Sequence, residues 1–272
     1  MTPTADRCRA FQTLHQSGCF VIPNPWDVGS ARVLAQLGFP ALATTSSGFA
    51  WSLGRPDNGA TLEEALAHFR SVADSVDVPV NADFEGGFAT MPATVAANVT
   101  RAVATGIAGL SIEDSTRDPS SPLLDFRLAV ERIQAARHAI DRSGTGAVLT
   151  ARSEGFIVGR PDLPETIRRL TAYADAGADC LYAPGIRATA DIEAVVKAVR
   201  PRPVNVLVGS NFATVAELAN AGVRRISVGG ALARAAWTGF LAAAREIAER
   251  GTFANLDDVV PFGEVNRLFG LE

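Results

Sequence analysis

VPVNADFEGGF occupies residues 78–88, and the rest of the fold can be read outward from it. Its first half is a short apolar run of the kind that forms a fully buried parallel strand. Its second half carries two acids and then Gly86 and Gly87, which leave room for a ligand or for close approach of the backbone. We therefore interpret residues 78–83 as a buried strand whose carboxyl end carries polar chemistry.

Seven further apolar runs of the same character alternate with longer stretches of helical period, as in chains of buried parallel strands and amphipathic helices. The strands are expected at 19–22, 41–44, 78–83, 109–113, 147–151, 179–183, 203–208 and 225–229. The helices are expected at about 27–37, 61–75, 92–105, 125–142, 164–176, 189–199, 213–221 and 231–249. Eight strands favour a (β/α)8 TIM-type barrel over a doubly wound sheet.

Local signals support these boundaries. Thr61 and Glu64 have the spacing of a capping box at a helix start. Gly38, Gly106, Gly177 and Gly222 each follow a helix and precede a strand, so we expect them in the left-handed conformation of helix ends.

The composition fits one domain over residues 1–272. Hydrophobic residues make up 47% of the chain and charged residues 20%, with a net charge of −4. No basic field suggests nucleic acid, no apolar run suggests a membrane span, and the N-terminus does not resemble a signal peptide. We expect a cytoplasmic protein in which Cys8, Cys19 and Cys180 are reduced and mostly buried.

The chain lacks the residues that two common mechanisms of barrel enzymes require. Lys197 is the single lysine, and it lies in a predicted helix, so a strand lysine that forms a Schiff base is close to excluded. His15, His68 and His138 also lie in predicted helices, which argues against a histidine base at a strand end.

The acids at the strand ends are the main candidates for chemistry. Asp83 and Glu85 are two residues apart and can face the same mouth of the barrel, and Glu113 and Asp114 end the next strand. Carboxylates gathered on one rim repel each other unless a cation or proton intervenes, and oxygen ligands suit Mg²⁺. The alternative is that these acids pair with arginines in structural salt bridges.

Arg152 ends the fifth strand on the same rim. A guanidinium can grip a carboxylate or phosphate in a bidentate manner, so Arg152 is a candidate for holding an anionic substrate. The alternative is a structural pair with Glu113 or Glu154.

Three segments exceed what a barrel needs. Residues 45–60 follow the second strand and contain Ser46-Ser47-Gly48, which can present amides and a hydroxyl to an anion or form an ordinary turn. Asp57 in this loop can return to a metal through a water or belong to a plain Pro-Asp turn. Residues 114–124 follow the fourth strand, and residues 250–272 form an apolar tail that we expect to pack on a neighbouring subunit.

The segment from Asn24 to Asp57, followed by NADFEGGF, SIED and TARSEGF, resembles the isocitrate lyase/phosphoenolpyruvate mutase superfamily, in the methylisocitrate lyase-like subgroup. The resemblance covers about residues 20–250. It implies a TIM-type barrel whose last helix is exchanged between subunits of a homodimer, usually within a homotetramer. It also implies a small 2-oxo acid as substrate and an enolate as the shared intermediate.

The resemblance also assigns roles to site residues. It implies that Mg²⁺, with Mn²⁺ as an alternative ion, is held by Asp83, Glu85 and Glu113, with Asp57 in the outer shell. It places the substrate carboxylate on the segment Ser46, Ser47 and Gly48, with Arg152 completing the grip. Arg152, Glu113 and Asp57 are the expected catalytic residues, and Asn205 on strand seven is expected to line the pocket and bind substrate.

The loop at 114–124 departs from the family pattern. The lyases carry Lys-Lys-Cys-Gly-His there, with the cysteine as proton donor, and the mutases carry a lysine and an asparagine. This chain has DSTRDPSSPLL, without cysteine, lysine, histidine or asparagine. Replacement groups are Arg117, Ser115, Ser120, Tyr182 or a metal-bound water, and the residues alone do not choose among them.

The leading hypothesis is therefore a Mg²⁺-dependent enzyme that acts on a 2-oxo dicarboxylate or a 2-methylisocitrate-like acid through an enolate, as a carbon–carbon lyase or decarboxylase. The alternatives are a 2-oxo-acid-binding protein without turnover and phosphoryl chemistry of the mutase type. A phosphosugar enzyme that uses Gly229-Gly230 as a phosphate cradle ranks last, because it leaves the acids unexplained.

Overall fold

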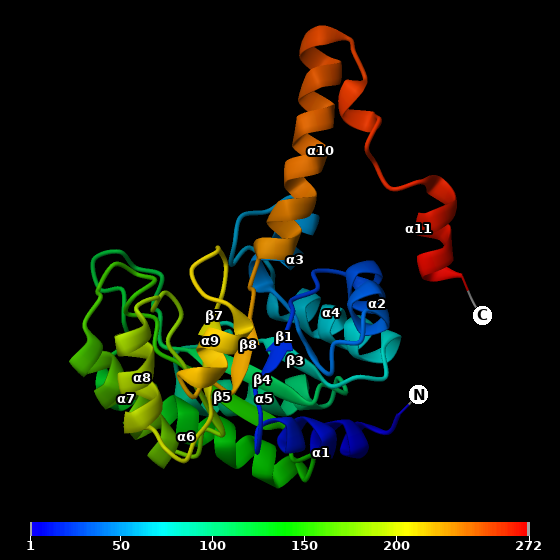
Figure 1. The fold of residues 1–272 in the computed structure, drawn as a ribbon. Coiled ribbons are helices and arrows are strands. Elements are labelled where there is room, and N and C mark those ends of the chain that lie inside the picture. The colour runs from blue at the N-terminus through cyan, green and yellow to red at the C-terminus, as the bar shows by residue number, and fades with distance from the viewer. Residues whose placement is uncertain (1, 271–272) are drawn as a thin grey trace.

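Eight short parallel strands form a nearly closed barrel in the computed structural model, which describes residues 2–270 (Figure 1). The strands are β1 (Phe20–Ile22), β2 (Leu42–Ala43), β3 (Val80–Asp83), β4 (Gly109–Glu113), β5 (Val148–Arg152), β6 (Cys180–Tyr182), β7 (Val204–Leu207) and β8 (Arg225–Ser227). They pair in the order β1-β8-β7-β6-β5-β4-β3-β2. At the remaining seam, the Ala43 amide donates a hydrogen bond to the Pro23 carbonyl at 3.0 Å. The predicted TIM-type barrel is confirmed.

Most helices cover the outside of the barrel, the first one closes its amino-terminal end, and the tenth projects away from it (Figure 1). They are α1 (Thr4–Leu14), α2 (Val28–Gln36), α3 (Ser46–Ser52), α4 (Leu62–Ser75), α5 (Pro92–Val103), α6 (Phe126–Ser143), α7 (Leu163–Asp175), α8 (Thr189–Ala198), α9 (Val215–Asn220), α10 (Ala231–Arg250), the 3₁₀ turn η1 (Ala254–Leu256) and α11 (Phe262–Phe269). Eight helices match the predicted ranges closely. α3 and α11 fall in segments expected to be a loop and a tail, and α1 has no predicted counterpart beyond the helix expected around His15.

The predicted helix ends are confirmed. The Thr61 hydroxyl accepts a hydrogen bond from the Glu64 amide at 3.3 Å, and the Glu64 carboxylate accepts one from the Thr61 amide at 2.8 Å. Gly38, Gly106 and Gly177 have φ angles of 84°, 91° and 99°. Gly222 has φ 85°. A side chain at such positions would be strained, which explains glycine at the four helix ends.

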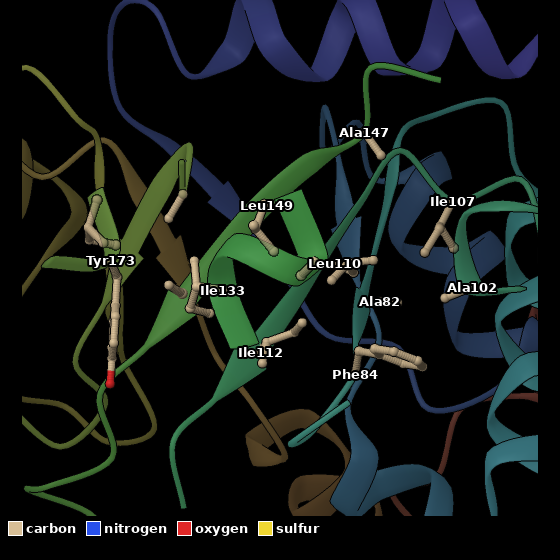
Figure 2. Packing of buried hydrophobic residues seen from close by; sticks show 14 of the residues in the cluster. Ala82, Phe84, Ala102, Ile107, Leu110, Ile112, Ile133, Ala147, Leu149 and Tyr173 are labelled. Carbon is tan, nitrogen blue, oxygen red and sulfur yellow. The ribbon is translucent and has the colours of Figure 1, made fainter. Parts of the chain in front are cut away.

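Two hydrophobic cores hold the barrel. The larger one fills the space between the strands and the surrounding helices. Figure 2 shows Leu110, Ile112 and Leu149 on the outer faces of β4 and β5, with Ile133 of α6 beside them. The smaller core lies inside the barrel, where Phe11 of α1 packs against strand side chains such as Phe20. Because alternate strand residues face opposite sides, β2 contributes Leu42 to the larger core and Ala43 to the smaller one, and β5 contributes Leu149 and Val148 in the same way.

α10 projects away from the barrel, and the chain then returns toward α2 through η1 and α11 (Figure 1). Of the 20 residues of α10, Ala233 and Glu246 are buried. The Glu246 carboxylate accepts hydrogen bonds from the Ala254 and Asn255 amides at 3.0 and 2.7 Å, which fixes η1 against α10. Large apolar side chains along this segment remain exposed, including Phe240 at 60%.

Two further expectations concern residues 2–270. No helix in this range is long and apolar enough to cross a membrane. Cys8, Cys19 and Cys180 are free thiols; Cys8 and Cys180 are buried and Cys19 is partly buried, as predicted.

Candidate active site

A cavity of 410 Å³ opens at the carboxyl ends of the strands. This volume lies within the range of about 300–1,000 Å³ that is common for small-molecule sites. Its lining includes Asn24, Thr44, Ser46, Ser47, Asp57, Asn81, Asp83, Ser111, Glu113, Ser115, Arg117, Arg152, Glu154, Tyr182, Arg225, Ser227, Gly229 and Gly230. The cavity therefore lies on the face that carries the active site in TIM barrels.

Arg152 joins three carboxylates at the base of this cavity. Its Nη1 donates to the Asp83 carboxylate at 2.8 Å, and its Nε donates to Glu154 at 2.8 Å. Its Nη2 lies 3.2 Å from the Glu113 carboxylate. Glu113 and Arg152 are register partners on β4 and β5, so the strands place them side by side. Both partners weighed from the sequence, Glu113 and Glu154, thus contact Arg152, and Asp83 is a third.

Asp83 also connects β3 to the start of α3. Its second carboxylate oxygen accepts hydrogen bonds from the Ser46 amide at 3.0 Å and the Ser46 hydroxyl at 2.9 Å. Ser46 thus acts on Asp83 in this structure, while both Ser46 and Ser47 line the cavity.

Gly48 is needed for packing. It is the third residue of α3, and its amide points to the Thr45 hydroxyl, which caps the helix. A Cβ at this position would lie 2.8 Å from the Trp26 Cβ. It would also lie 2.7 Å from Thr45 Cγ2, so the close approach of both Thr45 and Trp26 requires glycine here. Gly48 does not line the cavity.

Glu85 does not line the cavity, but it contacts Arg117, which does. Its side chain is buried and forms an ion pair with the Arg117 guanidinium. Glu85 and Arg117 both have positive φ angles, 49° and 65°. Such strain in non-glycine residues is concentrated at functional sites. Burial raises the pKa of Glu85 to about 7, although Arg117 opposes the shift.

The other acids of the site are also crowded. Burial raises the pKa of Glu113, and the nearby Glu154 and Asp83 carboxylates raise it further, against the effect of Arg152. Burial and then the Asp83 charge raise the pKa of Asp57, which lines the cavity from the loop after α3. For both acids, burial disfavours the ionised form more strongly than the nearby arginine charges favour it.

Asp114 does not join this group, although it follows Glu113 directly. Adjacent residues at a strand end point to opposite sides, and the Asp114 carboxylate contacts α7, where it accepts hydrogen bonds from Tyr173 at 2.6 Å and Arg169 at 3.1 Å. Its other oxygen accepts one from the Glu154 amide at 2.8 Å. Asp114 therefore anchors the strand ends from outside the cavity.

Asn205 lies one layer below the cavity. It is buried, does not itself line the cavity and bonds to Arg225 and Ser227, which do. Arg225 was not among the residues expected from the sequence; the alternation of Arg225 and Ser227 with the apolar Ile226 and Val228 in RISVG is the signal that could have identified an inward-facing polar group.

Asn24 is a second residue that sequence reasoning missed. Its side-chain oxygen accepts hydrogen bonds from the Val228 and Gly229 amides at 2.9 and 2.8 Å. Its side-chain nitrogen donates to the Thr44 carbonyl at 3.1 Å, across the seam between β1 and β2. Because Asn24 already satisfies two amides of the loop after β8, a phosphate cradle at Gly229-Gly230 is disfavoured.

Comparison with known proteins gives the family. The family model described as phosphoenolpyruvate phosphomutase matches residues 11–248. This chain belongs to that family. It is thus an enzyme of the isocitrate lyase/phosphoenolpyruvate mutase superfamily, as the sequence motifs indicate.

Individual relatives support this assignment. An uncharacterized protein of Mycobacterium tuberculosis H37Rv is 32% identical over 81% of both chains. The oxaloacetate decarboxylase of Bradyrhizobium diazoefficiens is 31% identical over 66% of this chain and 64% of its own. A Burkholderia cenocepacia J2315 protein, named only as a lyase or mutase, has a solved structure with a TM-score of 0.95 and 47% identity over 98% and 97% of the two chains.

The site residues fit the divalent metal that this superfamily implies. Within residues 2–270, no three acidic, histidine or cysteine side chains are already converged on one point. Mg²⁺ does not require such convergence, because it keeps several waters and binds directly to one or two carboxylates. The crowding of Asp57, Asp83 and Glu113 around one cavity supplies suitable oxygen donors. Glu85 would have to leave Arg117 to take part.

The loop at 114–124 is ordered although it lacks the family's proton-donating residues. Ser115 and Leu123 form an antiparallel bridge, and the Thr116 amide donates to the Pro122 carbonyl at 2.9 Å. The Arg169 side chain donates to the Leu124 carbonyl at 3.0 Å. These contacts bring Ser115 and Arg117 to the edge of the cavity, while Ser120 does not line it.

Proposed function

We propose that this family member is a Mg²⁺-dependent enzyme that binds a small 2-oxo acid and breaks a carbon–carbon bond through its enolate, as a lyase or decarboxylase. The observation that carries the proposal is the cavity above β3, β4 and β5, which gathers Asp83, Glu113 and Arg152 at its base. Carboxylates there suit a hard cation, and a guanidinium suits the carboxylate of the ligand.

The named relatives favour this chemistry. They include a 2-methylisocitrate lyase of Escherichia coli and a 2,3-dimethylmalate lyase of Eubacterium barkeri. A solved structure of oxaloacetate acetylhydrolase holds oxalate, and it aligns with this chain at a TM-score of 0.87 and 26% identity. These proteins handle small carboxylic acids, which is the substrate class we propose here.

Each site residue then has a role. Asp83, Glu85 and Glu113 would hold the metal directly or through water, with Asp57 in the outer shell. When bound, Mg²⁺ supplies positive charge that stabilises an enolate of a 2-oxo acid. Arg152 would exchange part of its contact with Asp83 and Glu113 for the ligand's carboxylate, next to Ser46 and Ser47.

Calorimetric titration tests the binding site. Oxalate and 2-oxoglutarate are titrated with and without Mg²⁺, and we expect binding that requires the metal. Tight binding that does not depend on Mg²⁺, or no binding under any condition, would contradict the proposal.

A variant at Asp83 tests the metal assignment. Asp83→Ala should abolish Mg²⁺-dependent oxalate binding, because it removes a carboxylate that we propose holds the metal. The same carboxylate contacts Ser46 and Arg152. Asp74→Ala, at an exposed position on α4, is the matched control and should bind as the wild type does. Equal binding by both variants would show that Asp83 holds no metal.

Turnover separates an enzyme from a binding protein. Pyruvate release is followed for a panel of 2-oxo acids together with 2-methylisocitrate. Binding without release from any of them would favour the 2-oxo-acid-binding protein that the bare loop at 114–124 suggests.

The active assembly that we propose is a homodimer or homotetramer in which α10 and the tail at 250–272 pack on a second copy. The exposed apolar side chains of α10, among them Phe240 and Leu241, form a surface that a monomer would leave in water. The tail also contacts its own chain, because Gln36 of α2 donates to the Leu268 carbonyl at 2.8 Å. A second copy would therefore cover the free face of α10 first.

A further inference from the structure

A buried chain of polar side chains runs across β8, β7 and β6 and ends in the cavity. Arg225 Nε donates to the Asn205 side-chain oxygen at 2.9 Å, and the Asn205 side-chain nitrogen donates to the Ser227 hydroxyl at 2.9 Å. Tyr182 follows on β6 in register with Asn205, and hydrogen bonding to the Ser227 hydroxyl partly offsets the rise that burial causes in the Tyr182 pKa. All four residues are at least nine-tenths buried, and Tyr182 lines the cavity.

Arg225 sets which group donates and which accepts in each of these hydrogen bonds. A guanidinium can only donate hydrogen bonds, so the Asn205 atom that faces Arg225 must be the oxygen. The Asn205 nitrogen must then face Ser227, whose oxygen accepts. The Ser227 proton is left to donate to the Tyr182 oxygen, and the Tyr182 proton is left to point into the cavity.

Arg225 is fixed from the opposite side as well. Its Nη1 lies 3.4 Å from His15 Nε2, while His15 Nδ1 lies 2.7 Å from the Phe11 carbonyl. Burial and the Arg225 charge lower the pKa of His15 to about 3, so His15 is neutral and Nε2 accepts from Arg225. The guanidinium therefore cannot turn away from Asn205 without losing two partners.

Tyr182 has suitable surroundings for a donor. The Arg152 guanidinium lies 5.2 Å from the centre of its ring, at the base of the cavity where the proposed ligand carboxylate would lie. Burial raises the pKa of Tyr182 to about 12, so the phenol keeps its proton at neutral pH. The loop at 114–124 offers no cysteine, histidine or lysine, and arginine does not release its proton in proteins.

We propose that Tyr182 is the proton donor of this site and that Arg225, through Asn205 and Ser227, is the positioning residue that aims it. The inference rests on the proposed function, because the acceptor is the enolate of a 2-oxo acid. In the step, the Tyr182 O–H bond breaks and a C–H bond forms at the carbon next to the oxo group. The enolate C=C supplies the electron pair, its oxygen becomes the oxo group again, and solvent water returns a proton to the phenolate.

The test uses a half-reaction that does not depend on the native carbon–carbon partner. Exchange of the pyruvate methyl protons with D₂O is followed by NMR in the presence of Mg²⁺, because the group that protonates the enolate also removes the proton in reverse. Tyr182→Phe should reduce enzyme-dependent exchange by about 10²–10⁴-fold, while calorimetry shows oxalate affinity within about threefold of the wild type. The chain contains one other tyrosine, Tyr173, which contacts Asp114 outside the cavity. Tyr173→Phe is the matched control, and we expect a lower melting temperature with unchanged exchange per folded molecule.

The positioning role is tested by a pair of variants. Arg225→Lys still presents only donors to Asn205 and should keep most of the exchange rate. Arg225→Met removes the donor, so the Asn205 amide and the Ser227 hydroxyl are no longer held in one orientation. This variant should lower the exchange rate at least about tenfold with little change in oxalate affinity. Equal rates for these two variants, at equal folded fraction, would overturn the role of Arg225.

The outcomes separate this inference from the proposed function. A wild-type protein that fails to bind oxalate with Mg²⁺ would refute the proposed function itself. A wild-type protein that binds oxalate but does not exchange pyruvate protons would refute the enolate chemistry of both proposals. A wild-type protein that exchanges, together with a Tyr182→Phe variant that exchanges at the same rate, would refute Tyr182 alone.

Discussion

Arg152 supplies the positive charge that faces Asp83, Glu113 and Glu154 in the cavity. Arg152→Met should lower the free energy of unfolding by about 3–5 kcal/mol at pH 7, the usual cost of leaving buried charges without a partner. Mg²⁺ should restore part of the loss, because a second cation can face the same acids. Urea unfolding with and without Mg²⁺ measures both effects, and Arg152→Lys, which keeps the charge with fewer donors, should lie between. Wild-type stability of Arg152→Met would show that the three acids are already neutral.

His68 makes the stability depend on pH. It is buried in α4 and stacks on Phe49 with ring centres 4.0 Å apart. Burial lowers its pKa to about 4 from 6.5. The unfolded chain therefore binds the proton more readily, so stability is complete above pH 6.5 and falls as the pH drops toward 4. The full loss is about 3 kcal/mol, at 1.36 kcal/mol per pKa unit.

His68→Phe keeps the ring stack and removes the titrating group. The difference in unfolding free energy between this variant and the wild type should grow in favour of the variant between pH 7.5 and pH 4.5. His138→Phe, at an exposed position on α6, controls for the general loss of a histidine. A constant difference across this range would mean that folding does not shift the pKa of His68.

At the level of single residues, the sequence places acids correctly at strand ends but does not fix what they contact. The register of β4 and β5 brings Glu113 and Arg152 together, which follows from strand boundaries alone. The partner of Glu85 is Arg117, which lies 32 residues further along the chain. Its contact depends on the path of the loop at 114–124 and on two positive φ angles, and no local pattern in the sequence specifies either.

Among the helices, α10 has the largest number of exposed large apolar side chains. Phe240→Glu should convert the proposed assembly into a smaller species, because a buried charge at an interface is strongly unfavourable. Light scattering coupled to size exclusion measures the mass. Met91→Glu, which also replaces an exposed apolar side chain but lies at the start of α5, should leave the mass unchanged. A wild-type protein that is already monomeric would refute the exchange of α10.

Element boundaries are well predicted where hydrophobic period and capping agree, as for α4 with its Thr61–Glu64 box. α3 shows the limit of this reasoning. It has seven residues, SSGFAWS, and contains Gly48, which weakens helices. It forms because Thr45 caps it and because Gly48 packs tightly against Trp26 and Ala233, contacts that arise only in the folded barrel.

For the whole molecule, α1 closes the inside of the barrel from the amino-terminal end. Phe11 is fully buried there and contacts His15 edge to face, with ring centres 4.6 Å apart. Phe11→Ala should cost about 3–5 kcal/mol of stability, as for other large core side chains. Chemical denaturation measures the loss, and Phe253→Ala, at a position 60% exposed, is the control. A small effect at Phe11 would mean that the barrel interior holds together without α1.

The architecture as a whole follows from repetition, since eight apolar runs separated by amphipathic stretches leave few other folds. The polar interior is harder to foresee. Asn205 lies in a run that is otherwise apolar, whereas Arg225 follows Arg224 and precedes Ile226. The two become neighbours because β7 and β8 pair with these residues in register. Their role emerges only when the barrel closes.

The distribution of tryptophan has an optical consequence. The chain has three tryptophans, and all three lie near the base of α10: Trp26 and Trp237 line one hollow, and Trp51 and Trp237 line another. Intrinsic fluorescence therefore originates almost entirely where a second copy would dock. Emission should shift to longer wavelength as the protein is diluted and its subunits separate, so the assembly can be followed at nanomolar concentration without an added dye.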